Sequence, residues 1–323
     1  MNRRIKYFVL ALFFLSLATP KVCAQFLNQP RVLYTVVYNR TSESVNMPVM
    51  IGAVNIAEGR FYGVQMGFFN QIARSMRGTQ FGFANLIGDE SLGAQFGFAN
   101  LVREESSGAQ FGFVNMVGRS SLGAQFGFVN IASGNLTGAA FGGINMHREV
   151  NGMQIGIVNI AQRYKRGIPI GVVTWIREGG YQAVEVSSDI FHPYNIAIKT
   201  GIPKFYTTII VALSSDLDRR SGQGAGIGSI IDMGRNGWFF NPEANFISTF
   251  NKKSKSFISL YPNLGYHIGN NFSFVASPYV TWQFVQRGEV LLDPVYSLYT
   301  KEFNSRNAIY LGFHFGLRYT INQ

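Results

Sequence analysis

Apolar and polar residues alternate strictly along the segment 306–322. One side carries Ile309, Leu311, Phe313, Phe315, Leu317, Tyr319 and Ile321, and the other carries Tyr310, Gly312, His314, Gly316, Arg318, Thr320 and Asn322. Because successive side chains of a β-strand point to opposite faces, this pattern is typical of a transmembrane β-barrel strand with lipid outside and a polar interior. The alternation recurs over 256–268 and 272–286, and further strands are predicted at 181–190, 194–200, 204–215, 222–232 and 238–250.

A second pattern, a tandem repeat, occupies 48–176. Its units begin at Pro48, Gly63, Gly78, Gly93, Gly108, Gly123, Gly138, Gly152 and Gly167, a spacing of 15 residues with one step of 14. The fifth residue is glycine in every unit, from Gly52 to Gly171, and the eighth is asparagine in every unit except the last. The third residue is glutamine in six units, at Gln65, Gln80, Gln95, Gln110, Gln125 and Gln154.

Two architectures fit this repeat. In an antiparallel meander, each unit is a strand of about eleven residues followed by a polar turn, which is the length of a membrane-spanning β-strand. Phe126 and Phe128 then face lipid, Gln125 faces the lumen, and the side on which Asn130 lies stays open. In a β-solenoid, each unit is one coil, and the asparagines and glutamines stack in ladders. We expect such a coil to be too narrow for two phenylalanines and a further aliphatic residue in each ~4.8 Å layer.

The prediction is therefore an all-β chain, an antiparallel transmembrane β-barrel of about 18 strands. The segment 31–40 is the candidate first strand, nine strands come from the repeat, and eight follow it. The alternative is a set of β-solenoid repeats beside a smaller C-terminal barrel. In the first reading 25–323 is a single outer-membrane barrel, with repeat strands over 48–176 and non-repeat strands over 177–323. The segment 287–306 is then a surface loop, or a plug if it folds inward.

The N-terminal segment 1–24 has the pattern of a secretory signal peptide. Basic residues precede an apolar run from Phe8 to Ala18, and Val22-Cys23-Ala24 fits a cleavage site after Ala24. Lipid modification of Cys23 is the alternative, which Pro20-Lys21-Val22 disfavours. The net charge of +11 falls to 11 − 4 = +7 without this segment, which holds four basic and no acidic residues. Only 14% of all residues are charged, against about 25% in soluble domains, so part of the surface is expected to face lipid.

The G-x-Q-x-G-x-x-N units resemble a family of bacterial surface-repeat proteins, in which such units recur in tandem behind a signal peptide. The resemblance covers 48–175, and the C-terminal half is similar to outer-membrane β-barrels in general. What this resemblance implies is a location in the cell envelope, here the outer membrane. It assigns no catalytic residue.

Candidate chemistry is sparse. The expected lumen-lining residues are Gln65, Gln80, Gln95, Gln110, Gln125, Gln154, His267 and His314. The expected partners are membrane lipid and outer-leaflet headgroups, with small polar solutes as further candidates and no nucleic acid. No cofactor or metal site is predicted, and the oligomeric state stays open.

Three functions are compatible with these patterns. A barrel of about 18 strands usually encloses an aqueous channel, so the first is passive passage of small polar solutes. The second is a structural or adhesive surface protein with a plugged lumen. The third is a membrane-embedded hydrolase that uses His267 or His314 with Glu243 and Ser259. We expect the protein not to be an enzyme, which places the third function last.

Overall fold

The computed structural model describes residues 32–321, apart from 43, 215–219, 235 and 251–254. The expected signal peptide at 1–24 lies outside the described residues. The chain divides into two compact units, Met1–Gly138 and Ala139–Gln323.

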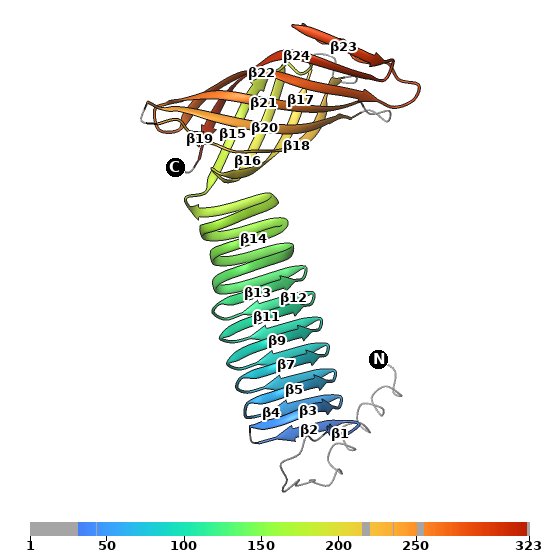
Figure 1. Cartoon of the computed structure of the whole chain (residues 1–323), viewed down its shortest axis with the longest axis vertical. Helices are drawn as coiled ribbons and strands as arrows, with labels where there is room; N and C mark the ends of the chain where they lie inside the picture. Colours follow the sequence, from blue (N-terminus) through green and yellow to red (C-terminus); the bar gives the residue numbers. More distant parts are fainter. Residues whose placement is uncertain (1–31, 43, 215–219, 235, 251–254, 322–323) are drawn as a thin grey trace, which may run out of the picture. The chain divides into compact units, whose positions relative to one another are not determined.

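The first unit is a parallel β-solenoid (Figure 1). Each strand pairs in register with the strand one repeat later, so that Gly108 faces Gly123 and Asn100 faces Asn115. A coil contains two strands that are joined by tight corners. The strands are β1 (Val32–Tyr34), β2 (Tyr38–Thr41), β3 (Val45–Ile51), β4 (Val54–Ala57), β5 (Phe61–Met66), β6 (Phe69–Ile72), β7 (Met76–Phe81), β8 (Ala84–Ile87), β9 (Glu90–Phe96), β10 (Ala99–Val102), β11 (Glu105–Phe111), β12 (Val114–Val117) and β13 (Ser121–Phe126). The long β14 (Val129–Glu178) covers the remaining repeat residues.

The prediction of a single barrel of about 18 strands is therefore wrong for the repeat, and the solenoid alternative is confirmed. The objection to a solenoid assumed that the repeat phenylalanines would lie inside the coil. Gln110 and Asn115 are buried inside the coil, whereas Phe113 is 47% exposed and Phe111 is half-buried. Because the phenylalanines point outward, the narrow coil never has to contain them, and the volume objection to a solenoid does not apply.

Two ladders of amide side chains lie in the solenoid core, beside an apolar column that includes Ile72, Ile87 and Val102. Gln80, Gln95, Gln110 and Gln125 each donate to the glutamine one unit earlier, as Gln95 Nε2 does to Gln80 Oε1 at 2.9 Å. The repeat asparagines from Asn55 to Asn115 each donate to the asparagine one unit later and to a backbone carbonyl, as Asn100 Nδ2 does to Asn115 Oδ1 at 2.8 Å and to Phe111 O at 3.0 Å. Buried amides are stable only when their polar atoms find such partners, which explains why both columns recur.

The glycine columns are required by backbone geometry. At the first position of a unit, Gly108 has φ of 144°, a region essentially closed to other residues, and a Cβ there would lie 1.9 Å from Gly93 O. At the fifth position, a Cβ on Gly112 would lie 2.4 Å from Gly97 O and 2.7 Å from the Asn100 amide nitrogen. The repeat motif thus encodes how closely neighbouring coils approach.

The second unit contains most of β14 and a closed antiparallel barrel of eight strands. These are β15 (Tyr181–Ser188), β16 (Tyr194–Ile202), β17 (Phe205–Leu213), β18 (Gly222–Gly228), β20 (Trp238–Thr249), β21 (Lys255–Ile268), β22 (Phe272–Val285) and β24 (Asn307–Thr320). Pairing of β15 with β24 closes the barrel. Two short strands, β19 (Ile231–Asp232) and β23 (Tyr299–Asn304), pair with β20 and β24.

The eight strands predicted after the repeat coincide with these eight barrel strands. Their alternation is also as predicted: along β24, Phe313, Phe315 and Leu317 are 44–51% exposed, whereas His314 and Arg318, at alternate positions, are buried. In a water-soluble protein the apolar side chains would point inward and the polar ones outward. The opposite arrangement seen here is that of a barrel surrounded by lipid.

Candidate functional site

Four charged side chains meet inside the barrel, and we call Glu185, Lys199, Glu243 and Arg318 the ion quartet. Lys199 Nζ lies 3.3 Å from Glu185 Oε1 and 2.5 Å from Glu243 Oε1. Arg318 Nη2 lies 2.6 Å from Glu185 Oε2 and 3.1 Å from Glu243 Oε1. All four are buried. Two cations and two anions balance, as a dry interior demands.

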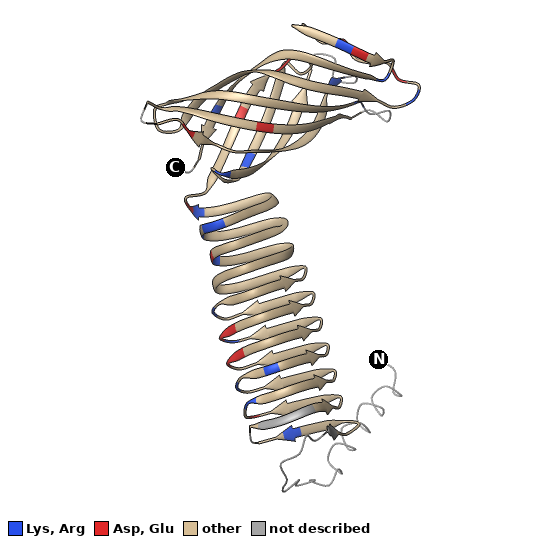
Figure 2. Ribbon diagram, in the orientation of Figure 1, with Lys and Arg blue, Asp and Glu red and all other residues tan. Residues whose placement is uncertain are grey.

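Neutral polar groups complete the quartet. Tyr206 donates its hydroxyl to Glu243 at 2.5 Å, and Arg318 Nη2 donates to Asn241 Oδ1 at 2.7 Å. The rings of Tyr181 and Tyr206 pack on each other with centroids 4.8 Å apart, and Lys199 Nζ lies 5.6 Å from the centroid of the Tyr206 ring. Side chains from five different strands therefore converge here. Charged residues are otherwise few on the barrel strands and gather at the corners of the coils (Figure 2).

One end of the barrel interior is filled by its own loop. Ile190 and Phe191, from the β15–β16 connection, are buried in a cluster with Phe257, Tyr279 and Tyr310. Asp189 holds this loop, since its Oδ1 accepts the backbone N–H groups of Phe191 and His192, both at 2.8 Å. Leu292 joins the same cluster, so part of the segment 287–306 folds inward. An eight-stranded barrel is just wide enough for side chains to fill it.

The predicted lumen residues fall in two different places. Gln65, Gln80, Gln95, Gln110, Gln125 and Gln154 are buried in the solenoid and line no barrel lumen, because their strands belong to coils. His314 does lie inside the barrel, where its Nδ1 donates to Asn263 Oδ1 at 3.0 Å. His267 is half-buried and is hydrogen-bonded to Ser273 Oγ at 2.9 Å.

The residues expected for a hydrolase are hydrogen-bonded to other partners. Ser259 Oγ donates to Thr281 Oγ1 at 2.7 Å, and Glu243 belongs to the ion quartet. Within the described part of the chain, no group of three His, Cys, Asp or Glu side chains is placed to hold a metal ion. A search of the same residues finds no helix long and apolar enough to cross a membrane.

Sequence reasoning missed the ion quartet, although a signal for it was present. Glu185 and Lys199 each interrupt a predicted strand that is otherwise rich in apolar residues, and each stands at an inward position of the alternation. A charge at an inward position of a narrow barrel demands a partner of opposite sign on another strand. Pairing Glu185, Lys199, Glu243 and Arg318 by sign would have identified the group.

A column of phenylalanines, the Phe edge, follows one corner of the solenoid. It consists of Phe68, Phe83, Phe98, Phe113 and Phe128, which are 47–66% exposed. Their rings stack face to face with centroids 5.0–5.2 Å apart. The coil does not need phenylalanine at this position, since other units carry Ala53 or Gly143 there. Contiguous exposed apolar surface of this kind is typical of interaction sites.

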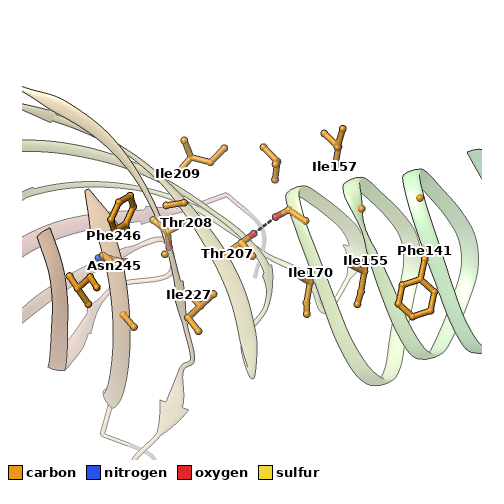
Figure 3. Close-up of a pocket in the computed structure, with 18 residues that line it drawn as sticks. Phe141, Ile155, Ile157, Ile170, Thr207, Thr208, Ile209, Ile227, Asn245 and Phe246 are labelled. Atoms are coloured by element: carbon orange, nitrogen blue, oxygen red, sulfur yellow. Dashed lines mark hydrogen bonds between the residues drawn. The ribbon is translucent and has the colours of Figure 1, made fainter. Parts of the chain in front are cut away.

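An apolar groove of about 900 Å³ lies within the second unit (Figure 3). The last coils of β14 supply Ile155, Ile157 and Ile170 to its wall, and the outer side of the barrel supplies Ile227 and Phe246. Thr207 Oγ1 donates to Gly171 O at 2.6 Å beside it, the dashed line in Figure 3. A groove lined in this way suits a hydrocarbon chain.

His147 gives the last coils a predicted sensitivity to acid. Gln154 Nε2 donates to His147 Nδ1 at 2.8 Å, and burial lowers the pKa of His147 to about 4. The unfolded chain has the ordinary value near 6.5, so it binds more protons than the folded chain between pH 6.5 and 4. Stability is therefore complete above pH 6.5 and falls as the pH drops towards 4. We expect about 2 kcal/mol less stability at pH 5 than at pH 7 for these coils.

Hydrogen exchange of the amides in 139–161 measures this loss locally. His147→Gln removes the titrating group and keeps a polar side chain opposite Gln154. After correction for the intrinsic pH dependence of exchange, the protection of 139–161 in His147→Gln should be the same at pH 5 and at pH 7. Equal protection in the unsubstituted protein would contradict the prediction.

Comparison with known proteins adds no relative: no protein-family model, no curated protein and no solved structure matches this chain.

Proposed function

We propose that the chain is an outer-membrane structural protein, in which the eight-stranded barrel is the anchor and the repeat coils before Tyr181 form a repeat arm. The observation that carries this proposal is the barrel surface. Leu260, Val280, Phe313 and Leu317, on three neighbouring strands, point outward and are 42–56% exposed. In water this surface would be a large aggregation-prone patch, whereas in a bilayer it is the required lipid contact.

Aromatic side chains at both barrel rims support the same placement. At the rim near the repeat arm, Trp238 packs on Tyr266 at 5.0 Å and Phe272 packs on Tyr319 at 5.2 Å. At the opposite rim, Trp282 lies 6.0 Å from Phe284. Membrane barrels carry such aromatic girdles where the hydrocarbon meets the headgroups.

The filled interior favours an anchor over a channel. The ion quartet occupies the barrel centre, and the loop with Ile190 and Phe191 fills one end. Passive transport and membrane-embedded hydrolysis stay predictions of lower rank. Swelling of vesicles in sugar solution tests transport directly, and an anchor gives no swelling.

The connections between strands support an orientation. Tyr181 pairs with Gly201 and Ala183 pairs with Thr320, so the chain enters the barrel at the rim that holds the 203–204 and 269–271 turns. The entry rim also holds the 229–237 connection, which includes β19. The other rim holds 189–193, 214–221, 250–254 and 286–306; each of these is longer than either tight turn, and 286–306 is the longest connection of the barrel. Outer-membrane barrels have short periplasmic turns and longer extracellular loops. The repeat arm then lies on the periplasmic side, which favours a structural role over surface adhesion.

Cysteine labelling in whole cells tests both the anchor and its orientation. In a Cys23→Ala background, one cysteine replaces Arg103, an exposed residue in a corner of the repeat arm, and another replaces Lys301, an exposed residue of β23. We expect a membrane-impermeant maleimide to label Lys301→Cys in intact cells. Arg103→Cys should be labelled at least tenfold less until the outer membrane is permeabilised.

Each variant controls for the other, because both sites are exposed and their reactivity becomes equal after permeabilisation. Labelling of Arg103→Cys alone in intact cells would reverse the orientation. Recovery of the protein in the soluble fraction, with both sites equally reactive, would refute the anchor.

A further inference from the structure

A second column of phenylalanines accompanies the Phe edge along the solenoid. It consists of Phe81, Phe96, Phe111 and Phe126, whose rings stack with centroids 4.8–4.9 Å apart. These residues occupy the fourth position of their units and the Phe edge occupies the sixth, so a single glycine lies between the two columns in the sequence. We call the two columns together the aromatic strip.

No charged residue lies in the part of the coils that carries the aromatic strip. The first nine residues are uncharged in all five units that begin at Gly63, Gly78, Gly93, Gly108 and Gly123. The charged residues of these units come later in each unit and gather around the other corner of the coil (Figure 2). A partner can therefore cover the strip without removing a charge from water, which would cost free energy.

The aromatic strip is larger than the apolar patch of an ordinary monomer. Exposed fractions of 47–66% along the Phe edge correspond to roughly 500 Å² of exposed aromatic surface. The second column, with Phe81 at 39% and Phe126 at 36%, adds roughly 250 Å². The largest apolar patch of a typical monomer covers about 300–600 Å². Each partner of a standard protein interface buries about 800 Å², so the strip has the area of an interface.

The stacking of the rings restricts what can cover the strip. Neighbouring ring planes are within 1–11° of parallel, so each ring covers the face of the next and presents its edge outward. A nucleobase stacks on an open aromatic face, which these columns do not offer along their length. The ring edges form an apolar surface that repeats once per coil, every 4.8–5.2 Å. A partner packs closely against it only if its own surface repeats at the same spacing.

We propose that the aromatic strip is a dimer interface, in which the repeat arms of two copies of this chain pack strip against strip. A second copy has the required spacing, the required apolar surface and no charge to bury. Identical side-chain ladders that repeat at about 4.8 Å form dry, closely packed interfaces between stacked β-sheets. Because both copies use the same patch, the contact is isologous and association stops at two chains. The inference concerns the repeat arm and does not depend on the membrane location of the barrel.

Photo-crosslinking in cells tests the dimer. The photoreactive amino acid p-benzoylphenylalanine replaces Phe83 in the full-length protein, which is co-expressed with an unsubstituted copy that carries a different epitope tag. We expect irradiation to give a product that contains both tags at the summed mass of two chains. The same amino acid in place of Arg103, an exposed residue at the other corner of the coil, should give at least tenfold less of this product.

Phe98→Ala/Phe113→Ala, introduced into both copies, removes two neighbouring rings from the strip. The coil tolerates alanine at this position, since Ala53 occupies it in another unit. Aromatic residues dominate the binding energy of protein interfaces, so the two-tag product from position 83 should fall at least tenfold. Leu101→Ala/Met116→Ala is the matched control, because it shortens two outward apolar side chains of the same coils outside the strip. It should leave the yield of the product within twofold.

Three results would overturn the dimer. One is crosslinking from position 83 only to lipid or to other proteins, or no crosslinking at all. Another is an equal yield of the two-tag product from positions 83 and 103, which indicates unspecific aggregation. The third is an equal loss in the two double variants, which indicates a damaged coil rather than a lost interface. In each case, protein that still fractionates with the membrane leaves the proposed anchor standing.

Discussion

Replacing Arg318 by methionine should remove about 3–5 kcal/mol from the free energy of unfolding of the barrel. The substitution leaves Glu185 and Glu243 to share Lys199 as their remaining cation, and all three are buried. A buried carboxylate without a partner is far more costly than the loss of the ion pair itself. Urea unfolding in vesicles, followed by the fluorescence of Trp238 and Trp282, measures the change.

The matched control is the double variant Arg318→Met with Glu185→Gln, in which one cation and one anion remain. It should recover at least half of the lost stability. Arg318→Lys should lie between the two, because lysine keeps the charge but cannot donate from the planar fork that now reaches both Glu185 and Asn241. A loss below about 1 kcal/mol in Arg318→Met is what an exposed ion pair shows, and it would indicate a water-filled lumen and a channel.

The barrel could be predicted strand by strand because lipid and a packed interior impose opposite demands on alternate residues. Phe313 and Leu317 are outside, and His314 and Arg318 inside, as the alternation indicates. What the pattern does not contain is the number of strands in the closed sheet. That number follows from the pairing of β15 with β24, whose paired residues are 127 to 137 positions apart in the sequence.

The repeat was misassigned because its period fits two folds. A spacing of 15 residues keeps Gln on one face of a meander and also stacks Gln on Gln in a solenoid. The side-chain pattern shows which residues share a face of the strand. It does not show which of the two faces points into the core. Amides such as Gln95 and Asn100 look like residues for a wet lumen, yet in a stack each satisfies the next and the core stays dry.

The candidate site divides in the same way. The sequence indicated His314 as an inward residue, and it contacts Asn263. The rest depends on contacts across strands, since the ion quartet joins side chains of four strands. Single positions in a strand can be read from alternation, whereas partners on other strands require the register.

Gly108→Ala should destabilise the solenoid by about 3–5 kcal/mol and split it at this coil. Alanine at φ of 144° is strained, and its Cβ would lie 1.9 Å from Gly93 O, so two costs combine at one residue. Each coil contacts mainly its neighbours, and a broken interface in such an array exposes the coils beside it.

Limited proteolysis should cut the variant between 93 and 123 at protease concentrations that leave the unsubstituted protein intact. Ala109→Thr is the control, because Thr79 occupies the equivalent position in another unit, and it should resist cleavage. Equal resistance of the two variants would show that the coils are not held as closely as Gly108 requires, and the solenoid assignment would fail with it.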